Sequence, residues 1–369
     1  MTMQAQRRMD GATMADRTAA ELGYRMPAEW EAHAAVWVSW PENVETWPGV
    51  MDAAREQFDA WVEVMRSVVP VCTTQALGLA TDDAWIRDYG PIFVVRDADA
   101  DAAAGAADVA GMAGGVAGAG PLALHDFRFD GWGGKYGPRA LDDAVPAWVA
   151  KALRIGSWQH DVVVEGGAID VDGRGTALVA EASVLDFRRN PGLSRAAAER
   201  LLAETLDVRQ AIWLRGNLAG DDTDGHVDNL ARFVAPDVVA LATAGPEHPD
   251  HATLQETRRL LEAARTAQGR ALQLVDLPMP EPVSYDFPPD RWSPGGREPL
   301  PASYANFLIT NGAVFVPAFG QPSDDHAARV LEGVFPGRRI MPVRCEHLIV
   351  GLGGLHCLSQ QQPAGPGAG

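Results

Sequence analysis

Residues 51–72 read MDAAREQFDAWVEVMRSVVPVC, and they contain the pattern from which the fold can be inferred. Large apolar residues recur there at the i, i+3, i+4, i+7 spacing of one helix face: Phe58, Trp61, Val62 and Met65. This spacing predicts a helix over 51–67. The apolar run at 68–72 then predicts a strand, so the stretch has the order helix, strand.

The same order recurs along the chain. Helical stretches are expected near residues 138–153, 193–206, 251–268 and 324–335. Each precedes a strand-like run, at 162–164, 211–214, 271–275 and 339–343. Further strand candidates lie ahead of several of these helices, at 35–40, 176–180, 237–244 and 307–317, the last with a turn at Asn311-Gly312. Gly269 and Gly337 are expected to end two of the helices.

Five strand–helix–strand units of unequal length follow from this pattern. They predict a repeated α/β fold rather than a two-domain dinucleotide-binding protein. The spacing between the units is too irregular for a solenoid.

Composition also predicts the domain limits. Residues 1–22 are polar and rich in alanine, and residues 364–369 are Gly, Pro and Ala, so both are expected to be mobile ends. The segment 97–120 is almost entirely Ala, Gly and Asp. Such a segment favours a disordered insertion in a loop, because it offers little apolar area to offset the ordering entropy. Residues 23–363 are then expected to form a single domain.

The charge balance restricts the range of partners. The 369 residues include 31 Lys plus Arg and 49 Asp plus Glu, a formal net charge of −18, which argues against binding to a nucleic-acid backbone or to anionic lipid. No run approaches the roughly 18 apolar residues of a membrane-spanning helix, and no apolar segment follows Arg7-Arg8 as an export signal requires. The sequence therefore predicts a cytoplasmic protein without nucleic-acid or membrane partners. It is compatible with a homo-oligomer.

Ionisable residues are concentrated in four segments, at 82–91, 162–170, 220–229 and 347–361. Each segment contains a candidate next to an apolar run: Asp88, Glu165, Asp228 and Cys357. Because residues at strand ends of an α/β fold converge on one mouth, these side chains are expected to share a site.

Cys357 is the candidate nucleophile among the three cysteines. The glycine-rich approach at 351–354 permits a tight backbone turn that exposes the thiol. Cys72 and Cys345 lie in strand-like runs and are interpreted as packing residues. The three have no CxxC spacing and cannot form a disulfide framework, which favours a reducing compartment and gives no metal-cluster pattern.

His226 is the candidate general acid/base, because a segment with four nearby acids is a poor environment for a packed core histidine. The spacing from His226 to Asp228 would place both side chains on one face of a strand. Both carboxylates have an alternative, non-functional interpretation. Glu165 could be a surface charge at the end of a strand, and Asp88 could form an ordinary ion pair with Arg87. The sequence does not decide whether His356 faces the site, because adjacent residues of a strand point to opposite faces and Cys357 is its neighbour.

Together these residues supply a thiol, an imidazole and several carboxylates but no lysine, a set that suits a small cation. Two carboxylates can each bind a planar guanidinium through paired N–H···O bonds and so fix its plane and position. A thiolate could then attack the central carbon. The expected partner is a small cationic guanidino compound, and this chemistry requires no metal and no organic cofactor.

Longer motifs span the chain from Met26 to Pro363. They are MPAEWEAHAAVWVSWP (26–41), WIRDYGP (85–91), FRFDGWGGKY (127–136), EGGAIDVDGRGT (165–176), RNPG (189–192), GDDTDGHVDNLARF (220–233), NGAVFVPAFG (311–320) and GGLHCLSQQQP (353–363). These motifs resemble those of the agmatine deiminase and bacterial-type (Porphyromonas-type) peptidylarginine deiminase family, in the guanidino-group-modifying superfamily. The resemblance implies a pentein fold, a fivefold pseudosymmetric α/β propeller of ββαβ units around a central active site.

The resemblance also implies roles for the residues that match the motifs. Cys357 would be the nucleophile, His226 the general acid/base and Glu165 a carboxylate that supports catalysis. Asp88 and Asp228 would hold the guanidinium between them.

The resemblance implies roles for further residues around the substrate. Trp85 would pack against the substrate, with a core tryptophan as the alternative. Asp222 would face the far amine of the substrate, a role that Asp221 could take instead. Leu352 departs from the family pattern, because many members have glycine at this position. The resemblance therefore does not determine the backbone conformation there.

The implied reaction is hydrolytic deimination. The thiolate attacks, ammonia leaves to give a covalent thiouronium, and water activated by His226 releases a ureido product. Agmatine is the first substrate expected, giving N-carbamoylputrescine for putrescine and polyamine biosynthesis. Deimination of peptidylarginine or free arginine to citrulline is the close alternative. An amidinotransferase and a catalytically silent cation-binding protein are further alternatives, whereas a papain-like protease has no use for the acidic residues.

Overall fold

The computed structural model describes residues 17–96, 120–289 and 295–365. The predicted insertion at 97–120 lies outside the described residues except for Gly120, as do parts of both predicted mobile ends. Residues 17–22 of the predicted extension are described, and they include the 3-10 helix η2 (Ala20–Leu22), which buries Leu22. The predicted boundary at residue 22 therefore falls within a packed segment.

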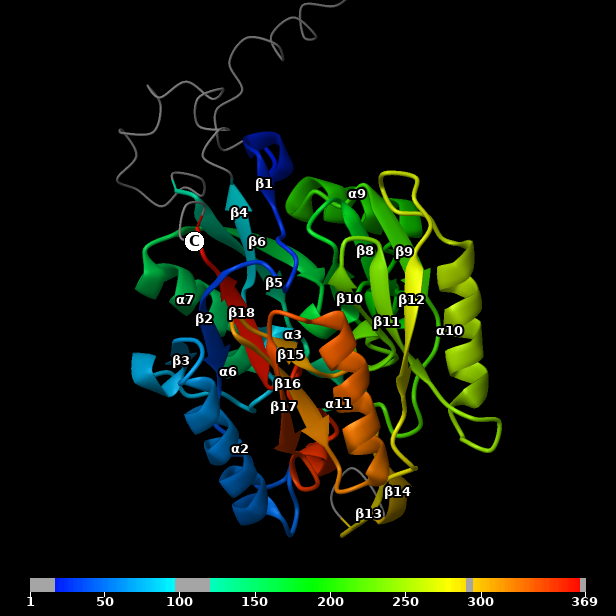
Figure 1. Ribbon diagram of the computed structural model, residues 1–369. Coiled ribbons are helices and arrows are strands. Elements are labelled where there is room, and N and C mark those ends of the chain that lie inside the picture. Colours follow the sequence, from blue (N-terminus) through cyan, green and yellow to red (C-terminus); the bar gives the residue numbers. More distant parts are fainter. Residues whose placement is uncertain (1–16, 97–119, 290–294, 366–369) are drawn as a thin grey trace, which may run out of the picture.

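Short strands form several small sheets (Figure 1). The strands are β1 (Tyr24–Arg25), β2 (His33–Val38), β3 (Val71–Thr73), β4 (Ile92–Arg96), β5 (Leu122–Arg128), β6 (Gly156–Val163), β7 (Ile169–Val171), β8 (Thr176–Ala180), β9 (Gln210–Leu214), β10 (Ala231–Ala235), β11 (Val238–Thr243), β12 (Gln273–Pro278), β13 (Ser284–Phe287), β14 (Gly296–Pro299), β15 (Leu308–Ile309), β16 (Ala313–Ala318), β17 (Arg339–Arg344) and β18 (Ser359–Pro363).

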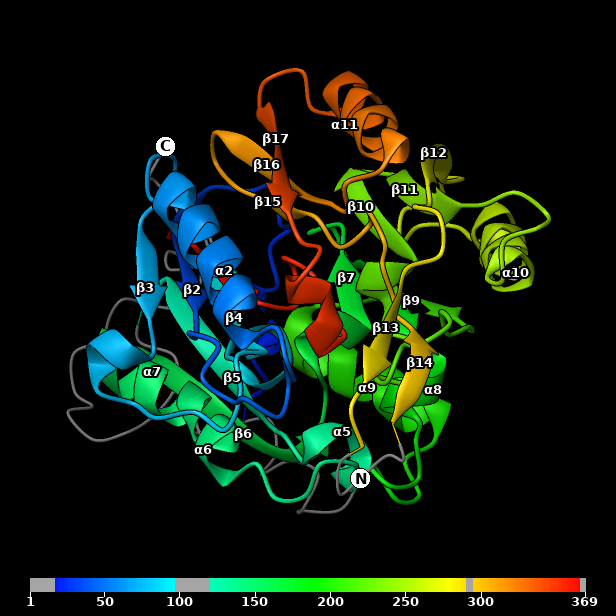
Figure 2. The same ribbon diagram turned by 90° about the horizontal axis from the view of Figure 1, so that it is seen from below.

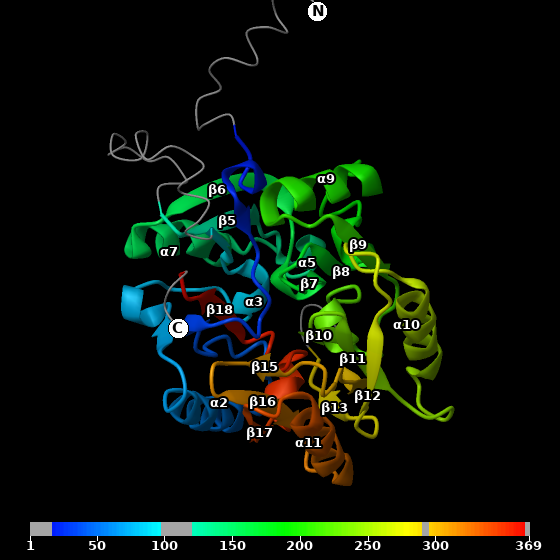
Figure 3. The same cartoon turned by 45° about the horizontal axis from the view of Figure 1, so that its top comes forward.

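The longer helices lie toward the outside of the molecule, as Figures 2 and 3 show. The α-helices are α2 (Met51–Met65), α3 (Ile86–Tyr89), α5 (Gly131–Gly134), α6 (Ala140–Asp143), α7 (Val145–Leu153), α8 (Glu181–Val184), α9 (Arg195–Leu206), α10 (His251–Ala263) and α11 (Pro322–Val334). The other 3-10 helices are η3 (Gln75–Leu77), η4 (Gly166–Ala168), η5 (Val227–Asn229) and η6 (Leu348–Gly351). Within the described ranges, no helix is both long and apolar enough to cross a bilayer.

One strand pattern recurs in five sheets of the described chain. Two strands pair antiparallel, and the chain then passes through one to three helices to a third strand that lies parallel to the second. The units are β4–β5–α5–α6–α7–β6, β7–β8–α8–α9–β9, β10–β11–α10–β12, β15–β16–α11–β17 and β18–β2–α2–β3. The repeated α/β fold predicted from residues 51–72 and the stretches that follow is confirmed. Figure 2 shows the sheets grouped around the red segment that follows β17.

Segments from opposite ends of the described chain build one of these units. β18 pairs antiparallel with β2, with Ser359 opposite Val38 and Gln361 opposite Val36, and β3 lies parallel to β2. Figure 1 shows β18 (red) beside β2 (blue). Cys357 lies just ahead of β18, so this pairing fixes the segment that carries the thiol.

The apolar face predicted in the first stretch packs inward. α2 buries Phe58, Trp61, Val62 and Met65. Trp61 contacts Phe58 edge-to-face and also reaches Phe315 of β16, with ring centroids 5.7 and 6.4 Å apart. Burying a large apolar side chain contributes about 1.5–3 kcal/mol, so this face holds α2 against two of the five units.

Three local predictions are wrong. The segment from His226 to Asp228 is not a strand but enters η5, and the run 348–350 is η6 rather than a strand. Periodicity cannot separate a strand from a turn over three residues, which explains both errors. Gly269 does not end α10, which stops at Ala263; with a φ of +75° it forms a turn between the bridged residues Arg265 and Ala271.

Candidate active site

A cavity of about 550 Å³ reaches the predicted nucleophile. Four of the predicted site residues line it: Trp85, Asp88, Asp222 and Cys357. The other three, Glu165, His226 and Asp228, are buried and do not line the cavity. His226 lies against Asp88 and Asp228 against Cys357, while Glu165 lies behind His226. The structure therefore brings all seven predicted residues into one region.

Cys357 has a buried thiol. The residue is 5% exposed, and its Sγ lies 3.7 Å from Asp228 Oδ2 and 3.1 Å from the side-chain nitrogen of Asn306. Burial, together with the charges of Asp228 and Asp88, raises the thiol pKa well above its ordinary value, while the Asn306 hydrogen bond lowers it. The thiol is accordingly protonated until a positive charge arrives beside it.

His226 and Glu165 form a buried pair. Nε2 of His226 lies 2.7 Å from Glu165 Oε2, which fixes the ring, whereas Nδ1 lies 3.5 Å from Asp88 Oδ1 and has no hydrogen bond within the described part of the chain. Burial alone would lower the pKa of His226, but Asp88 and Glu165 raise it to about 9. His226 is therefore an imidazolium at neutral pH, with one N–H available for proton transfer.

Asp88 is held at the start of α3 by two donors. The backbone N–H of Gly167 donates to Oδ1 at 3.1 Å, and Trp132 Nε1 donates to Oδ2 at 3.0 Å. Burial raises the pKa of Asp88, and although the His226 charge lowers it, the carboxylates of Glu165 and Asp228 raise it further, to about 6. Asp88 is thus mostly ionised at neutral pH.

Gly167 lies where three functional groups converge. A Cβ atom on this residue would be 2.5 Å from His226 Nδ1, 2.9 Å from Asp88 Oδ1 and 3.2 Å from Asp228 Oδ2. No side chain can be accommodated at such distances, so only glycine permits this arrangement.

Asp228 is fully buried and held from one side. His356 Nδ1 lies 2.7 Å from Oδ2, while Oδ1 has no hydrogen-bond partner in the described ranges. Burial raises the pKa of Asp228, but the hydrogen bond and charge of His356 outweigh it and the net shift is downward. The oxygen nearer the thiol, Oδ2, is thus already bonded, and Oδ1 is left to accept a hydrogen bond from a cationic ligand.

Trp85 forms part of the cavity wall and stacks on Trp47, with ring centroids 5.3 Å apart. It is both a packed and a cavity-lining residue, so the two interpretations of Trp85 are compatible. Gly353 lies against it: a Cβ there would be 2.4 Å from the Trp85 ring. Leu352, the departure from the family pattern, adopts a left-handed conformation with φ +72°, which favours glycine.

Asp222 and Asp221 differ in what they face. Asp222 lines the cavity and accepts hydrogen bonds from Tyr136 and Lys135. Asp221 is buried, and its carboxylate accepts from the backbone N–H and hydroxyl of Thr223. The geometry favours Asp222 as the acid available to a ligand.

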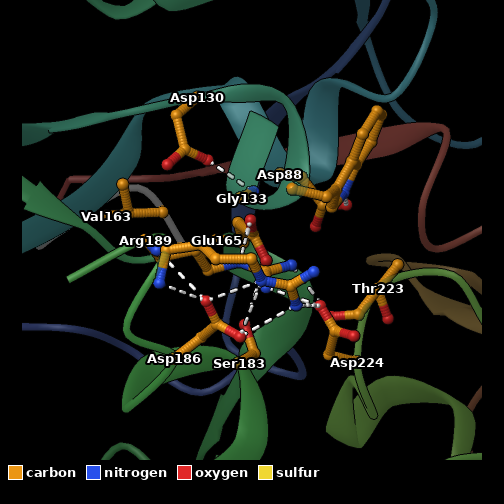
Figure 4. A network of polar contacts seen from close by, with 12 residues as sticks. Asp88, Asp130, Gly133, Val163, Glu165, Ser183, Asp186, Arg189, Thr223 and Asp224 are labelled. Carbon is orange, nitrogen blue, oxygen red and sulfur yellow. Dashed lines mark hydrogen bonds and ion pairs between the residues drawn. The ribbon is translucent and has the colours of Figure 1, made fainter. Parts of the chain in front are cut away.

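An arginine network lies behind the catalytic candidates (Figure 4). Arg189 is fully buried and donates from Nε to Glu165 Oε1 at 2.8 Å, from NH1 to Asp224 at 2.7 Å and from NH2 to the carbonyl of Thr223. Glu165 also accepts from Ser183. Burial would raise the pKa of Glu165, but Arg189 and His226 hold it at about 2. Arg189 therefore joins the Glu165–His226 pair to the loop that carries Asp222.

Comparison with known proteins identifies the family. The model for Porphyromonas-type peptidyl-arginine deiminases matches residues 25–363. The chain belongs to this deiminase family. The resemblance inferred from the motifs is therefore confirmed.

Named relatives of this deiminase-family chain are similar over nearly their whole length. The agmatine deiminase of Pseudomonas aeruginosa (strain LESB58) is 35% identical over 377 residues, covering 93% of this chain and 96% of the relative. The structure of the Enterococcus faecalis agmatine deiminase has a TM-score of 0.82 at 29% identity, covering 96% of this chain and 99% of that one.

A structure of C. Jejuni agmatine deiminase, a cysteine-to-serine variant with substrate bound, has a TM-score of 0.77 at 26% identity and covers 93% of this chain and 97% of that one. These similarities, together with the strand order, confirm the α/β pentein fold.

Sequence reasoning missed several residues of the deiminase site. Arg189 lies within the RNPG motif and Glu29 within the first motif, so both could have been singled out, but neither received a role. Asn306 and Trp47 lie outside the quoted motifs. Their contacts join segments roughly 40 to 300 positions apart, and spacing along the chain gives no signal for such contacts.

Proposed function

We propose that this protein is an agmatine deiminase, a hydrolase that converts agmatine and water to N-carbamoylputrescine and ammonia. The observation that carries the proposal is the convergence of Asp88, His226 and Asp228 around Gly167, with Cys357 Sγ 3.7 Å from Asp228. The activity of the relatives named above supports the same conclusion.

Binding begins with the guanidinium of the substrate. Its planar N–H groups match the ionised oxygens of Asp88 and Asp228, of which Asp228 Oδ1 has no hydrogen-bond partner among the described residues. The bound positive charge offsets the two carboxylates that disfavour ionisation of Cys357, so the thiol releases its proton to solvent. Substrate binding thus generates the nucleophile.

The first half-reaction makes a covalent intermediate. The Cys357 thiolate attacks the central carbon and forms a C–S bond. His226, which is protonated at neutral pH, then gives the proton on Nδ1 to the departing nitrogen, and the C–N bond breaks with release of ammonia. A thiouronium on Cys357 remains.

The second half-reaction reverses these roles. His226 is now neutral and removes a proton from a water molecule, which attacks the same carbon. The C–S bond breaks, the ureido product leaves and Cys357 is regenerated. Glu165 stabilises the imidazolium each time it forms, because it accepts from Nε2 at 2.7 Å.

The charge of the cavity supports agmatine over free arginine. Its lining includes Glu42, Glu45, Asp82, Asp83, Asp222 and Glu298, whereas its arginine, Arg139, is already paired with Asp83 at 3.4 Å. Such a lining attracts the second positive charge of agmatine and repels the carboxylate of arginine. Peptidylarginine has no such carboxylate and is the second candidate, which the description of the matching family favours.

A substrate panel tests the proposal. Purified protein is incubated with agmatine, free arginine, an internal arginyl peptide, or agmatine plus glycine, and the ureido product, ammonia and transferred amidine are measured. We expect ureido product and ammonia in equal amounts, with agmatine having the highest kcat/KM. A peptide preference would instead identify a peptidylarginine deiminase, amidine transfer would identify an amidinotransferase, and binding without turnover would contradict the enzymatic proposal.

Cysteine variants provide the second test. Cys357→Ala should abolish turnover, whereas Cys72→Ala, which changes a partly exposed cysteine outside the cavity lining, should retain it. Mass spectrometry of protein quenched during turnover should find the amidine adduct on Cys357. Turnover by Cys357→Ala would rule out the thiouronium route.

A further inference from the structure

Asn306 lies against the sulfur of Cys357. It belongs to the segment between β14 and β15 and is 1% exposed. Its Nδ2 is 3.1 Å from Cys357 Sγ and 2.9 Å from Asn229 Oδ1. One amide group therefore touches both the segment that carries the thiol and the segment that carries His226 and Asp228.

The orientation of this amide follows from its neighbours. The backbone N–H groups of His356 and Cys357 lie 3.0 and 3.3 Å from Asn306 Oδ1, and a backbone N–H can only donate. The amide oxygen must face these two donors, which leaves the NH2 group toward Asn229 and the sulfur. Each of its two hydrogens then has an acceptor, so the flipped amide is excluded.

Two hydrogen bonds favour a negative charge on the sulfur, the larger effect coming from Asn306 and the smaller from the backbone at Gly354. Asp228 lies 3.7 Å away and, with Asp88 and burial, disfavours the thiolate. The Asn306 N–H is a fixed dipole that points its positive end at the sulfur. A hydrogen bond to a charged acceptor is about twice as strong as one to a neutral acceptor, so this contact stabilises the thiolate more than the thiol.

We propose that Asn306 is a further catalytic residue, which donates a hydrogen bond to the Cys357 thiolate and so increases the fraction of reactive sulfur. The inference rests on the proposed deimination at the same site. It gives Asn306 a second task besides anchoring the backbone at 356–357.

The test separates these two tasks by measuring the thiol directly. Asn306→Ala removes both the donor and the backbone anchor. Asn306→Asp retains an oxygen for the two backbone N–H groups but turns a second oxygen toward the sulfur. The rate of Cys357 alkylation by iodoacetamide is followed from pH 6 to 10 and resolved from the other cysteines by peptide mass spectrometry.

We expect both variants to alkylate Cys357 about 10- to 100-fold more slowly than the native protein at pH 8, with the rate profile displaced to higher pH. Loss of kcat for agmatine of similar size should accompany the change, with KM altered less than about threefold. Asn311→Ala is the matched control, because the exposed Asn311 makes the same kind of two-atom contact with a backbone, that of His33, and is bonded to neither the sulfur nor residues 356–357; it should alkylate at the native rate.

Native alkylation rates in both Asn306 variants would overturn the proposal and leave Asn306 with a purely structural role. The same holds if Asn306→Asp restores the native rate, since the anchor alone would then suffice. Alkylation does not require turnover, so this outcome is distinguishable from failure of the deiminase proposal, in which the native protein itself would not turn over agmatine.

Discussion

Asp228 accepts a hydrogen bond from His356 at 2.7 Å, on the same oxygen that lies 3.7 Å from the Cys357 sulfur. The other ring nitrogen of His356 lies 2.8 Å from Glu29, whose pKa is lowered despite burial by Arg232 and His356. Both carboxylates are ionised and can only accept, and one ring nitrogen of His356 faces each of them. His356 therefore lies directly behind Asp228 and links it to Glu29.

Removing this link should destabilise the protein. His356→Ala leaves two buried carboxylates without their shared donor, and we expect the free energy of unfolding to fall by about 3–5 kcal/mol. Urea denaturation at neutral pH measures the change. His248→Ala, which removes a histidine near the start of α10, should cost less than about 1 kcal/mol. Equal losses in the two variants would contradict the role assigned to His356.

Substrate affinity should depend on pH through Asp88. With a pKa of about 6, Asp88 gains a proton below that pH and can no longer attract a guanidinium. In Cys357→Ala, where no chemistry occurs, agmatine affinity should fall about tenfold between pH 7 and pH 5. Isothermal titration calorimetry measures the constants. Adding Asp88→Asn should give weak binding that is constant over this range; a persisting pH dependence would point to another group.

Arg189 should be required for both stability and rate. Arg189→Met removes the buried guanidinium that pairs with Glu165 and Asp224, and we expect about 3–5 kcal/mol less free energy of unfolding and a lower kcat. The control is Arg195→Met, which breaks a partly exposed pair with Glu181 and should cost less than about 1 kcal/mol. Denaturation and agmatine kinetics on the same samples test the prediction, and a native kcat in Arg189→Met would refute it.

Gly353 should not accept a side chain. In Gly353→Ala the new methyl would meet the Trp85 ring at 2.4 Å and Cys357 Cβ at 3.0 Å, so one of them must move. We expect kcat/KM to fall at least about tenfold and stability by about 1–3 kcal/mol. Gly333→Ala in α11, where nothing lies within 4 Å, should be neutral or stabilising by up to about 1 kcal/mol. Similar kcat/KM and stability in the two variants would show that the backbone at 353 can move to accommodate a methyl group.

Periodicity along the chain predicted the repeated units well. The helix predicted over 51–67 is α2, and the strands predicted at 176–180 and 211–214 are β8 and β9 within one residue. In each of these elements the apolar pattern extends over enough residues to distinguish a helix from a strand. The three-residue runs at η5 and η6 are too short for that, which is why they were misassigned.

The site also contains residues that could be predicted from the sequence and contacts that could not. Cys357, His226, Asp88, Asp228 and Glu165 could be singled out because charged residues and motifs mark them locally, and the structure brings them together. The contacts that set their protonation could not be inferred. Glu29 and His356 are 327 positions apart and Asn306 and Cys357 are 51 apart, so only the folded chain reveals that they touch.

The pairing of β18 with β2 has a consequence for biosynthesis. β2 is synthesised before β18, and the other four units lie between them along the chain, so one edge of β2 stays open while those units emerge. The thiol at 357 emerges together with β18. A chain that lacks residues 357–363 therefore has neither the nucleophile nor the strand that pairs with this edge of β2, and activity requires that this segment has been synthesised and paired.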